Sequence, residues 1–233
     1  MAWIEHDHAD VGALVAHVAA SFESACREAI RTRGQAWLAL AGGRTPLPVY
    51  AHLAQAGLDG VVSAIPTDER CVPHDHPACN LRNLRDGFAA DPNIVVNAIT
   101  AEDGDEAASL AATRSLLALN PQPFDAVLLG MGADGHFASL FPGAANLAEG
   151  MALDSGIAAI STLPDPLPPE APFARISLTL PRLLHARALH LVVTGQDKRR
   201  VLREAQARDN DSQHPVASLL HAHGHTVHIH WSP

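Results

Sequence analysis

The sequence predicts an α/β fold of the three-layer, Rossmann-like kind, in which a mostly parallel central sheet is covered by helices on both faces. Short, nearly continuous apolar runs alternate along the chain with segments whose apolar residues recur at helical spacing. Such runs are typical of parallel strands, which are buried on both sides. The four clearest runs are each followed by a glycine-rich or polar turn, and parallel sheets bind ligands at the carboxyl ends of their strands.

The first elements are a helix and a strand-turn-helix unit. Apolar residues recur at helical spacing over residues 11–30, and Gly34 stands where a left-handed residue would end that helix. Residues 37–41 (WLALA) are a short apolar run that predicts a buried strand. Two glycines end this run, and Pro46 suits the first turn of the following helix.

The same combination of strand and turn recurs three times further along the chain. The strands and their turns are 61–65 before Asp68-Glu69-Arg70, 124–129 before Gly130 to His136, and 188–193 before Thr194-Gly195. Because the carboxyl ends of parallel strands lie at one edge, these turns are expected to lie close together.

A proline-rich segment precedes the last third of the chain. Five prolines lie between Ser161 and Pro172, and proline both removes a backbone donor and fixes φ, so regular structure is not expected there. The segment could link two domains or form a surface loop. Strand-like residues 175–180 follow at once, and neither side carries a self-contained set of motifs. We therefore expect a surface loop within a single domain that spans residues 1–233.

Composition indicates a globular, cytoplasmic protein. Of the 233 residues 47% are apolar, and no apolar run approaches the roughly 18 residues that cross a bilayer. The amino terminus lacks the basic start and the apolar stretch of a signal peptide. The net charge of −9 disfavours nucleic acid and anionic membranes as partners. No obligate protein partner is evident, and an anionic small substrate would need basic residues gathered locally.

The cysteines and the carboxyl-terminal histidines are not expected to form sites. Cys26, Cys71 and Cys79 show no C-x-x-C spacing, so we expect reduced thiols without a disulfide or a thiolate zinc site. Alternating histidines on a strand can chelate a metal, but a terminal segment rarely fixes the necessary geometry. We therefore expect a solvated terminal strand and no metal site from the five histidines concerned, His221, His223, His225, His228 and His230.

The turn Gly42-Gly43-Arg44-Thr45-Pro46 has the make-up of an anion cradle. Its glycines let the backbone approach a ligand, Thr45 offers a hydroxyl, and the next helix directs free N–H groups and a positive dipole end toward the same point. The alternative is a tight turn without a ligand, because strand-glycine-helix turns are common.

Two further turns carry titratable side chains. Asp68-Glu69-Arg70 is either part of a site or a solvated loop with a surface ion pair. The glycine-rich turn at 130–136 presents Asp134 and His136 two residues apart, and a histidine oriented by a carboxylate can act as a general base near neutral pH. Alternatively, Asp134 caps the next helix and His136 is a bystander.

Taken together and in this order, these segments resemble the 6-phosphogluconolactonase family, which shares its fold with glucosamine-6-phosphate deaminases and isomerases. The resemblance covers nearly the whole chain. The segments that carry it are LALAGGRTP (38–46), TDERCVP (67–73) with His76 and Asn80, LGMGADGHFASLFPG (129–143), RISLT (175–179) and TGQDK (194–198).

The resemblance implies hydrolysis of 6-phospho-D-glucono-1,5-lactone to 6-phosphogluconate, the second step of the oxidative pentose phosphate pathway, with no metal or organic cofactor. His136 would take a proton from the attacking water, Asp134 would help to place His136, and Arg70 would stabilise the oxyanion or position the sugar. The residues implied in binding the substrate and its phosphate are Gly42, Gly43, Arg44, Thr45, Asp68, Arg175 and Lys198.

The chain departs from the family pattern at three positions. Arg44 and Cys79 stand where serine is usual, and Phe137 stands where threonine is usual. Arg44 could contact the phosphate or another anion, or point outward. We expect the outward orientation, because the family manages the same task with serine.

Two other functions are compatible with the same fold. One is a sugar-phosphate deaminase or isomerase, but Asp68-Glu69-Arg70 and the uninterrupted segment 134–141 resemble the lactonase branch. The other is a non-catalytic sugar-phosphate sensor, which would need neither the Asp-x-His pair nor Arg70.

Overall fold

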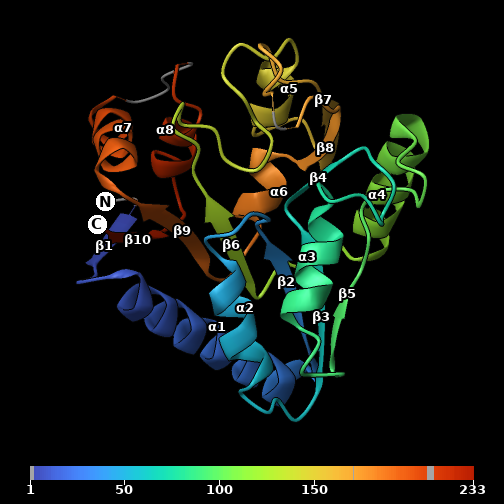
Figure 1. Ribbon diagram of the computed structural model, residues 1–233, viewed down its shortest axis with the longest axis vertical. Helices are drawn as coiled ribbons and strands as arrows, with labels where there is room; N and C mark the ends of the chain where they lie inside the picture. The colour runs from blue at the N-terminus through green and yellow to red at the C-terminus, as the bar shows by residue number, and fades with distance from the viewer. Residues whose placement is uncertain (1–2, 170, 209–212) are drawn as a thin grey trace.

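A computed structural model describes residues 3–169, 171–208 and 213–233 (Figure 1). The strands of its main sheet are β1 (Trp3–Asp7), β2 (Gln35–Leu40), β3 (Val61–Pro66), β5 (Ile94–Val96), β6 (Ala126–Gly130), β9 (Leu189–Thr194) and β10 (Val227–Ser232). Among the described residues, this sheet has seven strands in the order β1-β10-β9-β6-β2-β3-β5. Every neighbouring pair is parallel, which confirms the predicted class.

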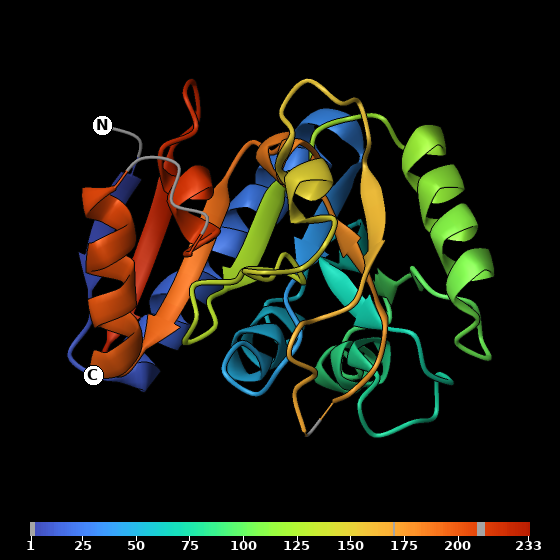
Figure 2. The ribbon, with the colours of Figure 1, turned by 90° about the horizontal axis from the view of Figure 1, so that it is seen from above.

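Helices cover both faces of this sheet (Figures 1 and 2). The helices of the described chain are α1 (Val11–Arg33), α2 (Leu47–Ala54), α3 (Asn80–Gly87), α4 (Glu106–Leu119), α5 (Leu147–Met151), α6 (Leu180–Leu184), α7 (Gln196–Ala207) and α8 (Val216–Leu220). Of these, α4 and α5 pack against the smaller sheet described below. Alternate residues of β2 enter different cores, because successive strand side chains point to opposite faces. Leu38 and Leu40 pack in the core with α1, α2 and α3, whereas Trp37 and Ala39 pack in the core with α6, α7 and α8.

Helix α1 has the limits that its residues predict. The Asp10 side chain caps its start by accepting a 2.8 Å hydrogen bond from the Ala13 N–H, and Gly34 ends it with φ of 80°. The apolar stripe, including Phe22, is buried against the sheet. No described helix is long and apolar enough to cross a bilayer.

A small antiparallel sheet lies beside the main one, and it was not predicted as a sheet. Its strands are β4 (Asp68–Arg70), β8 (Arg175–Leu178) and β7 (Ala159–Thr162), in the order β4-β8-β7. The segment 68–70, expected as a turn, is a strand because it pairs with β8 more than a hundred residues later. The proline-rich segment begins in the last residues of β7, and its remaining described residues carry no helix or strand, as predicted.

One prediction about the carboxyl-terminal histidines, that they lie on a solvated strand, is wrong in part. The expected solvated strand is wrong for His228 and His230, because β10 lies inside the sheet between β1 and β9 and is covered by α1. Strand β1 was not predicted, because its residues WIEHD form no apolar run. His230 is fully buried. By contrast, His223 and His225 are exposed in the loop before β10.

Six histidines pack together where α1 meets this edge of the sheet: five have stacked rings, and the ring of His17 lies tilted or edge-on against them. We call them the histidine stack: His6 and His8 of β1, His17 of α1, His190 of β9, and His228 and His230 of β10. Ring nitrogens of His190 and His230 lie 3.0 Å apart, and those of His8 and His230 lie 3.3 Å apart. Burial, and then the neighbouring histidines, lower the pKa of His190 to about 3 and that of His230 to about 2.

Candidate active site

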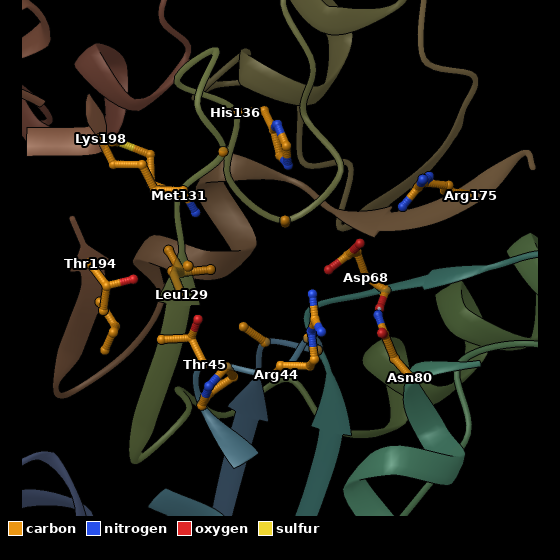
Figure 3. Close-up of a pocket in the computed structure, with 18 of the residues that line it drawn as sticks. Arg44, Thr45, Asp68, Asn80, Leu129, Met131, His136, Arg175, Thr194 and Lys198 are labelled. Atoms are coloured by element: carbon orange, nitrogen blue, oxygen red, sulfur yellow. The ribbon is translucent and has the colours of Figure 1, made fainter. Parts of the chain in front are cut away.

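A pocket of about 350 Å³ lies at the carboxyl ends of β2, β6 and β9 (Figure 3). This is the edge where the sequence places the functional turns. The predicted site residues that line it are Gly42, Gly43, Arg44, Thr45, Asp68, Arg70, His136, Arg175 and Lys198. Asp134, the remaining predicted residue, reaches the pocket through its contact with His136.

Asp134 and His136 form a hydrogen-bonded pair. The Nδ1 atom of His136 lies 2.6 Å from Oδ1 of Asp134, which also accepts the His136 backbone N–H at 3.2 Å. Burial would raise the pKa of Asp134, but the hydrogen bond and charge of His136 outweigh it, so this pKa is lowered. An ionised Asp134 holds a proton on Nδ1 and leaves Nε2 to accept one. The ring of His136 points into the pocket (Figure 3).

Gly132 explains why the turn before this pair is rich in glycine. A Cβ atom at this position would lie 2.2 Å from Nδ1 of His136 and 2.5 Å from Oδ1 of Asp134. The pair therefore rests directly on the Gly132 backbone. Gly135 supplies the left-handed residue of the turn, with φ of 80°.

The glycine turn after β2 forms the base of the pocket. Gly43 has φ of 91°, which strains any residue with a side chain. The α2 helix begins directly after the turn, and its amino end has no side-chain cap from the residue before it. The exposed side chain of Arg44 lines the pocket and points into it (Figure 3), rather than turning away as expected.

Basic side chains surround the pocket. Among the described residues that line the pocket, four have basic side chains and a single one has a carboxylate. The basic residues are Arg44, Arg70, Arg175 and Lys198, and the carboxylate belongs to Asp68. Burial lowers the pKa of both Arg175 and Lys198, and this effect is opposed by the nearby carboxylates of Asp68 and Asp134 respectively. Arg175 and Lys198 face the pocket from opposite sides (Figure 3). The pocket thus gathers the local positive charge that an anionic ligand needs in a chain with net charge −9.

The family follows from comparison with known proteins. A family model described as "Glucosamine-6-phosphate isomerases/6-phosphogluconolactonase" matches residues 9–229. The chain belongs to this family. The 6-phosphogluconolactonase of Pseudomonas putida is 37% identical over 98% of this chain and 92% of that protein. That of Rhizobium meliloti (strain 1021) is 35% identical over 88% of each.

Solved structures of the 6-phosphogluconolactonase family agree with this assignment. A 6-phosphogluconolactonase from Shewanella baltica OS155 has a TM-score of 0.90 and 30% identity, covering 99% of this chain and 97% of that one. A monomeric glucosamine-6-phosphate deaminase has a TM-score of 0.79 at 19% identity, which shows the shared fold alone. The resemblance noted in the sequence is confirmed.

Several residues that line the pocket or bond to its lining were not among the predicted site residues. Asn80 and Thr194 line the pocket, and Ser139 donates a 2.5 Å hydrogen bond to Oδ2 of Asp68. All three lie in segments that carry the family resemblance, which was the available signal. Among the described residues, no cluster of histidine, cysteine, aspartate and glutamate is arranged to hold a metal ion.

Proposed function

We propose that this chain is a lactonase that hydrolyses 6-phospho-D-glucono-1,5-lactone to 6-phosphogluconate, with His136 as the general base. The observation that carries the proposal is the pairing of Asp134 and His136 at 2.6 Å beside a pocket lined by four basic side chains. The relatives in Pseudomonas putida and Rhizobium meliloti carry the name of this activity. A sugar-phosphate sensor would not need such a pair.

In the proposed reaction, Nε2 of His136 removes a proton from water as the water oxygen attacks the lactone carbonyl carbon. Asp134 stabilises the imidazolium that forms. Arg70 stabilises the negative charge that develops on the carbonyl oxygen. The tetrahedral intermediate then breaks its bond to the ring oxygen, and His136 returns the proton to that oxygen. The products are a free hydroxyl and a carboxylic acid, which loses its proton to solvent to become the carboxylate.

A coupled assay with freshly generated lactone tests the function. The lactone also opens spontaneously, so the expected result is 6-phosphogluconate formation faster than in a matched blank, in proportion to the protein added. Incubation with glucosamine-6-phosphate is the parallel reaction, and we expect no release of ammonia. Deamination without lactone hydrolysis would assign the chain to the other branch of the family.

Arg175 and Lys198 are proposed to hold the substrate phosphate from opposite sides, together with Gly43 and Thr45. We expect Arg175→Ala and Lys198→Ala to raise KM for the phosphorylated lactone by about tenfold or more, the range for a lost charged contact. Unphosphorylated gluconolactone should be affected much less, because it lacks the group that they bind. Steady-state kinetics with both substrates measure this difference. Equal losses on both would assign the two residues to folding or to the chemical step.

A further inference from the structure

The buried carboxylate of Glu69 is the starting point of a network behind the pocket wall. Glu69 is fully buried in β4. Its Oε1 accepts the backbone N–H groups of Arg70 and Asn80, both at 2.8 Å, and its Oε2 accepts that of Leu81 at 2.7 Å. The residue before α3, Cys79, provides no side-chain cap. Glu69 therefore caps α3 from a strand ten residues earlier and fixes where this helix begins.

Asn80, the first residue of α3, carries this constraint to the pocket. It is 1% exposed. Its Nδ2 donates to the Asp68 carbonyl oxygen at 2.9 Å, and its Oδ1 accepts from Nη1 of Arg70 at 2.8 Å. Figure 3 shows its carboxamide beside Asp68. Both polar ends of the side chain are thus used to join α3 to β4.

The same carboxamide also touches the glycine turn. A Cβ atom at Gly42 would lie 2.0 Å from Oδ1 of Asn80, so this side chain occupies the space that any other residue at position 42 would need. One carboxamide therefore contacts both the turn proposed to cradle the phosphate and the guanidinium proposed to face the carbonyl oxygen. These two parts of the pocket come from β2 and β4, which are not neighbours in either sheet.

Arg70 depends on this contact for its position. Its Nη1 donates to the Ala78 carbonyl oxygen at 2.7 Å as well as to Asn80. Its Nε is buried and has no hydrogen-bond partner among the described residues. Two acceptors on one nitrogen fix the direction of the guanidinium plane, and removal of Asn80 leaves only the backbone acceptor at that nitrogen.

We propose that Asn80, fixed by Glu69, is a positioning residue that aligns the Arg70 guanidinium with the Gly42-Gly43 turn. Its effect on turnover rests on the proposed function, because Arg70 acts on the lactone only if the chain is a lactonase. The consequence for the orientation of Arg70 does not rest on it.

A double-mutant cycle measures the coupling to Arg70. We expect Asn80→Ala to lower kcat/KM about tenfold in the wild-type background, and less than about twofold in an Arg70→Ala background, which is the signature of residues that act together. Glu69→Gln should show the same pattern, since its amide places a donor against the N–H groups of α3. Asn93→Ala is the matched control, because Asn93 is not among the described residues that line the pocket and its Nδ2 donates to the Leu58 carbonyl oxygen instead. Equal effects of Asn80→Ala in both backgrounds overturn the proposal.

Hydrogen exchange at the Arg70 Nε–H group gives a readout independent of activity. With isotope-labelled arginine, assigned through Arg70→Lys, exchange should be about tenfold faster or more in Asn80→Ala, and unchanged in Asn93→Ala. Asn80→Ser, whose hydroxyl is too short to reach Nη1, replaces Asn80→Ala if the latter does not fold. Unchanged exchange in the folded variant overturns the inference. A wild-type chain without lactonase activity overturns the proposed function instead, and the exchange measurement still decides the role of Asn80.

Discussion

Replacement of His136 by alanine is expected to lower kcat for the phosphorylated lactone by roughly 10²–10⁴-fold, the usual contribution of a general base. The reason is the arrangement at the pocket wall, where Asp134 binds Nδ1 and leaves Nε2 to accept the proton of water. The fold should be preserved, since the ring lies on the pocket wall with 29% of its side chain exposed. KM should change little, because no contact to the phosphate is proposed for His136.

The measurement is the rate above the spontaneous opening of the lactone, with thermal unfolding as a check on the fold. His223→Ala is the matched control, because His223 is exposed in the loop before β10 and lies outside the pocket. Asp134→Asn should lose activity as well, since a neutral amide no longer stabilises the imidazolium. A His136→Ala protein with near-wild-type kcat would remove His136 from the mechanism.

Acid is expected to destabilise the folded chain well before most carboxylates are protonated. The pKa of His190 is lowered to about 3 and that of His230 to about 2, chiefly by burial. Below pH 6.5 the unfolded chain binds protons at these rings and the folded chain does not. The free energy of unfolding therefore falls as the pH falls. Between pH 6.5 and 5, each ring should contribute a loss of about 1.5 kcal/mol, or about 3 kcal/mol together.

The other groups around these two rings act in the same direction. His6 of β1 and His17 of α1 lower the pKa of both rings further. His228 lowers that of His190, and His8 and His190 lower that of His230. The carboxylate of Asp7 raises the pKa of the neighbouring His8, but it does not act on the two buried rings and instead pairs with Arg199 at 2.7 Å. No compensating carboxylate therefore reaches the buried centre of the stack among the described residues.

Urea unfolding at several pH values measures the slope. His190→Phe replaces the ring by one that does not titrate, so its slope between pH 6.5 and 5 should be smaller than that of the wild type by about one proton. His223→Ala again serves as the control, because an exposed ring should leave the slope unchanged. Identical slopes for wild type and His190→Phe would show that His190 is protonated in the folded state.

The parts of the site that could be predicted are those encoded by adjacent residues. The glycines after β2, and the Asp134-Gly135-His136 turn after β6, define their backbone and their chemistry within a few positions. The parallel sheet then brings them to one edge, so their proximity was also predictable. The orientation of Arg44 was not predictable. A long flexible side chain beside a pocket can point into the pocket or toward solvent, and the residue type alone does not decide between the two.

The parts that could not be predicted depend on contacts between distant segments. β4 is only three residues long and becomes a strand by pairing with β8. The role of Asn80 depends on Glu69 in another element, and the burial of His230 depends on β1. In each case the local sequence is compatible with an exposed loop or strand, and the partner that changes the outcome lies elsewhere in the chain.

The pairing of β1 with β10 also determines the order in which this edge of the sheet can form. The two strands align residue by residue, Trp3 with Val227 and Asp7 with Trp231, more than 220 positions apart. During synthesis β1 emerges first, yet its partner strand does not exist until almost all of the described chain has been made. Until then His6 and His8 lack the rings of His228 and His230, which they contact in the completed sheet. Completion of the sheet is thus a late event, and it is also the event that withdraws His190 and His230 from protons.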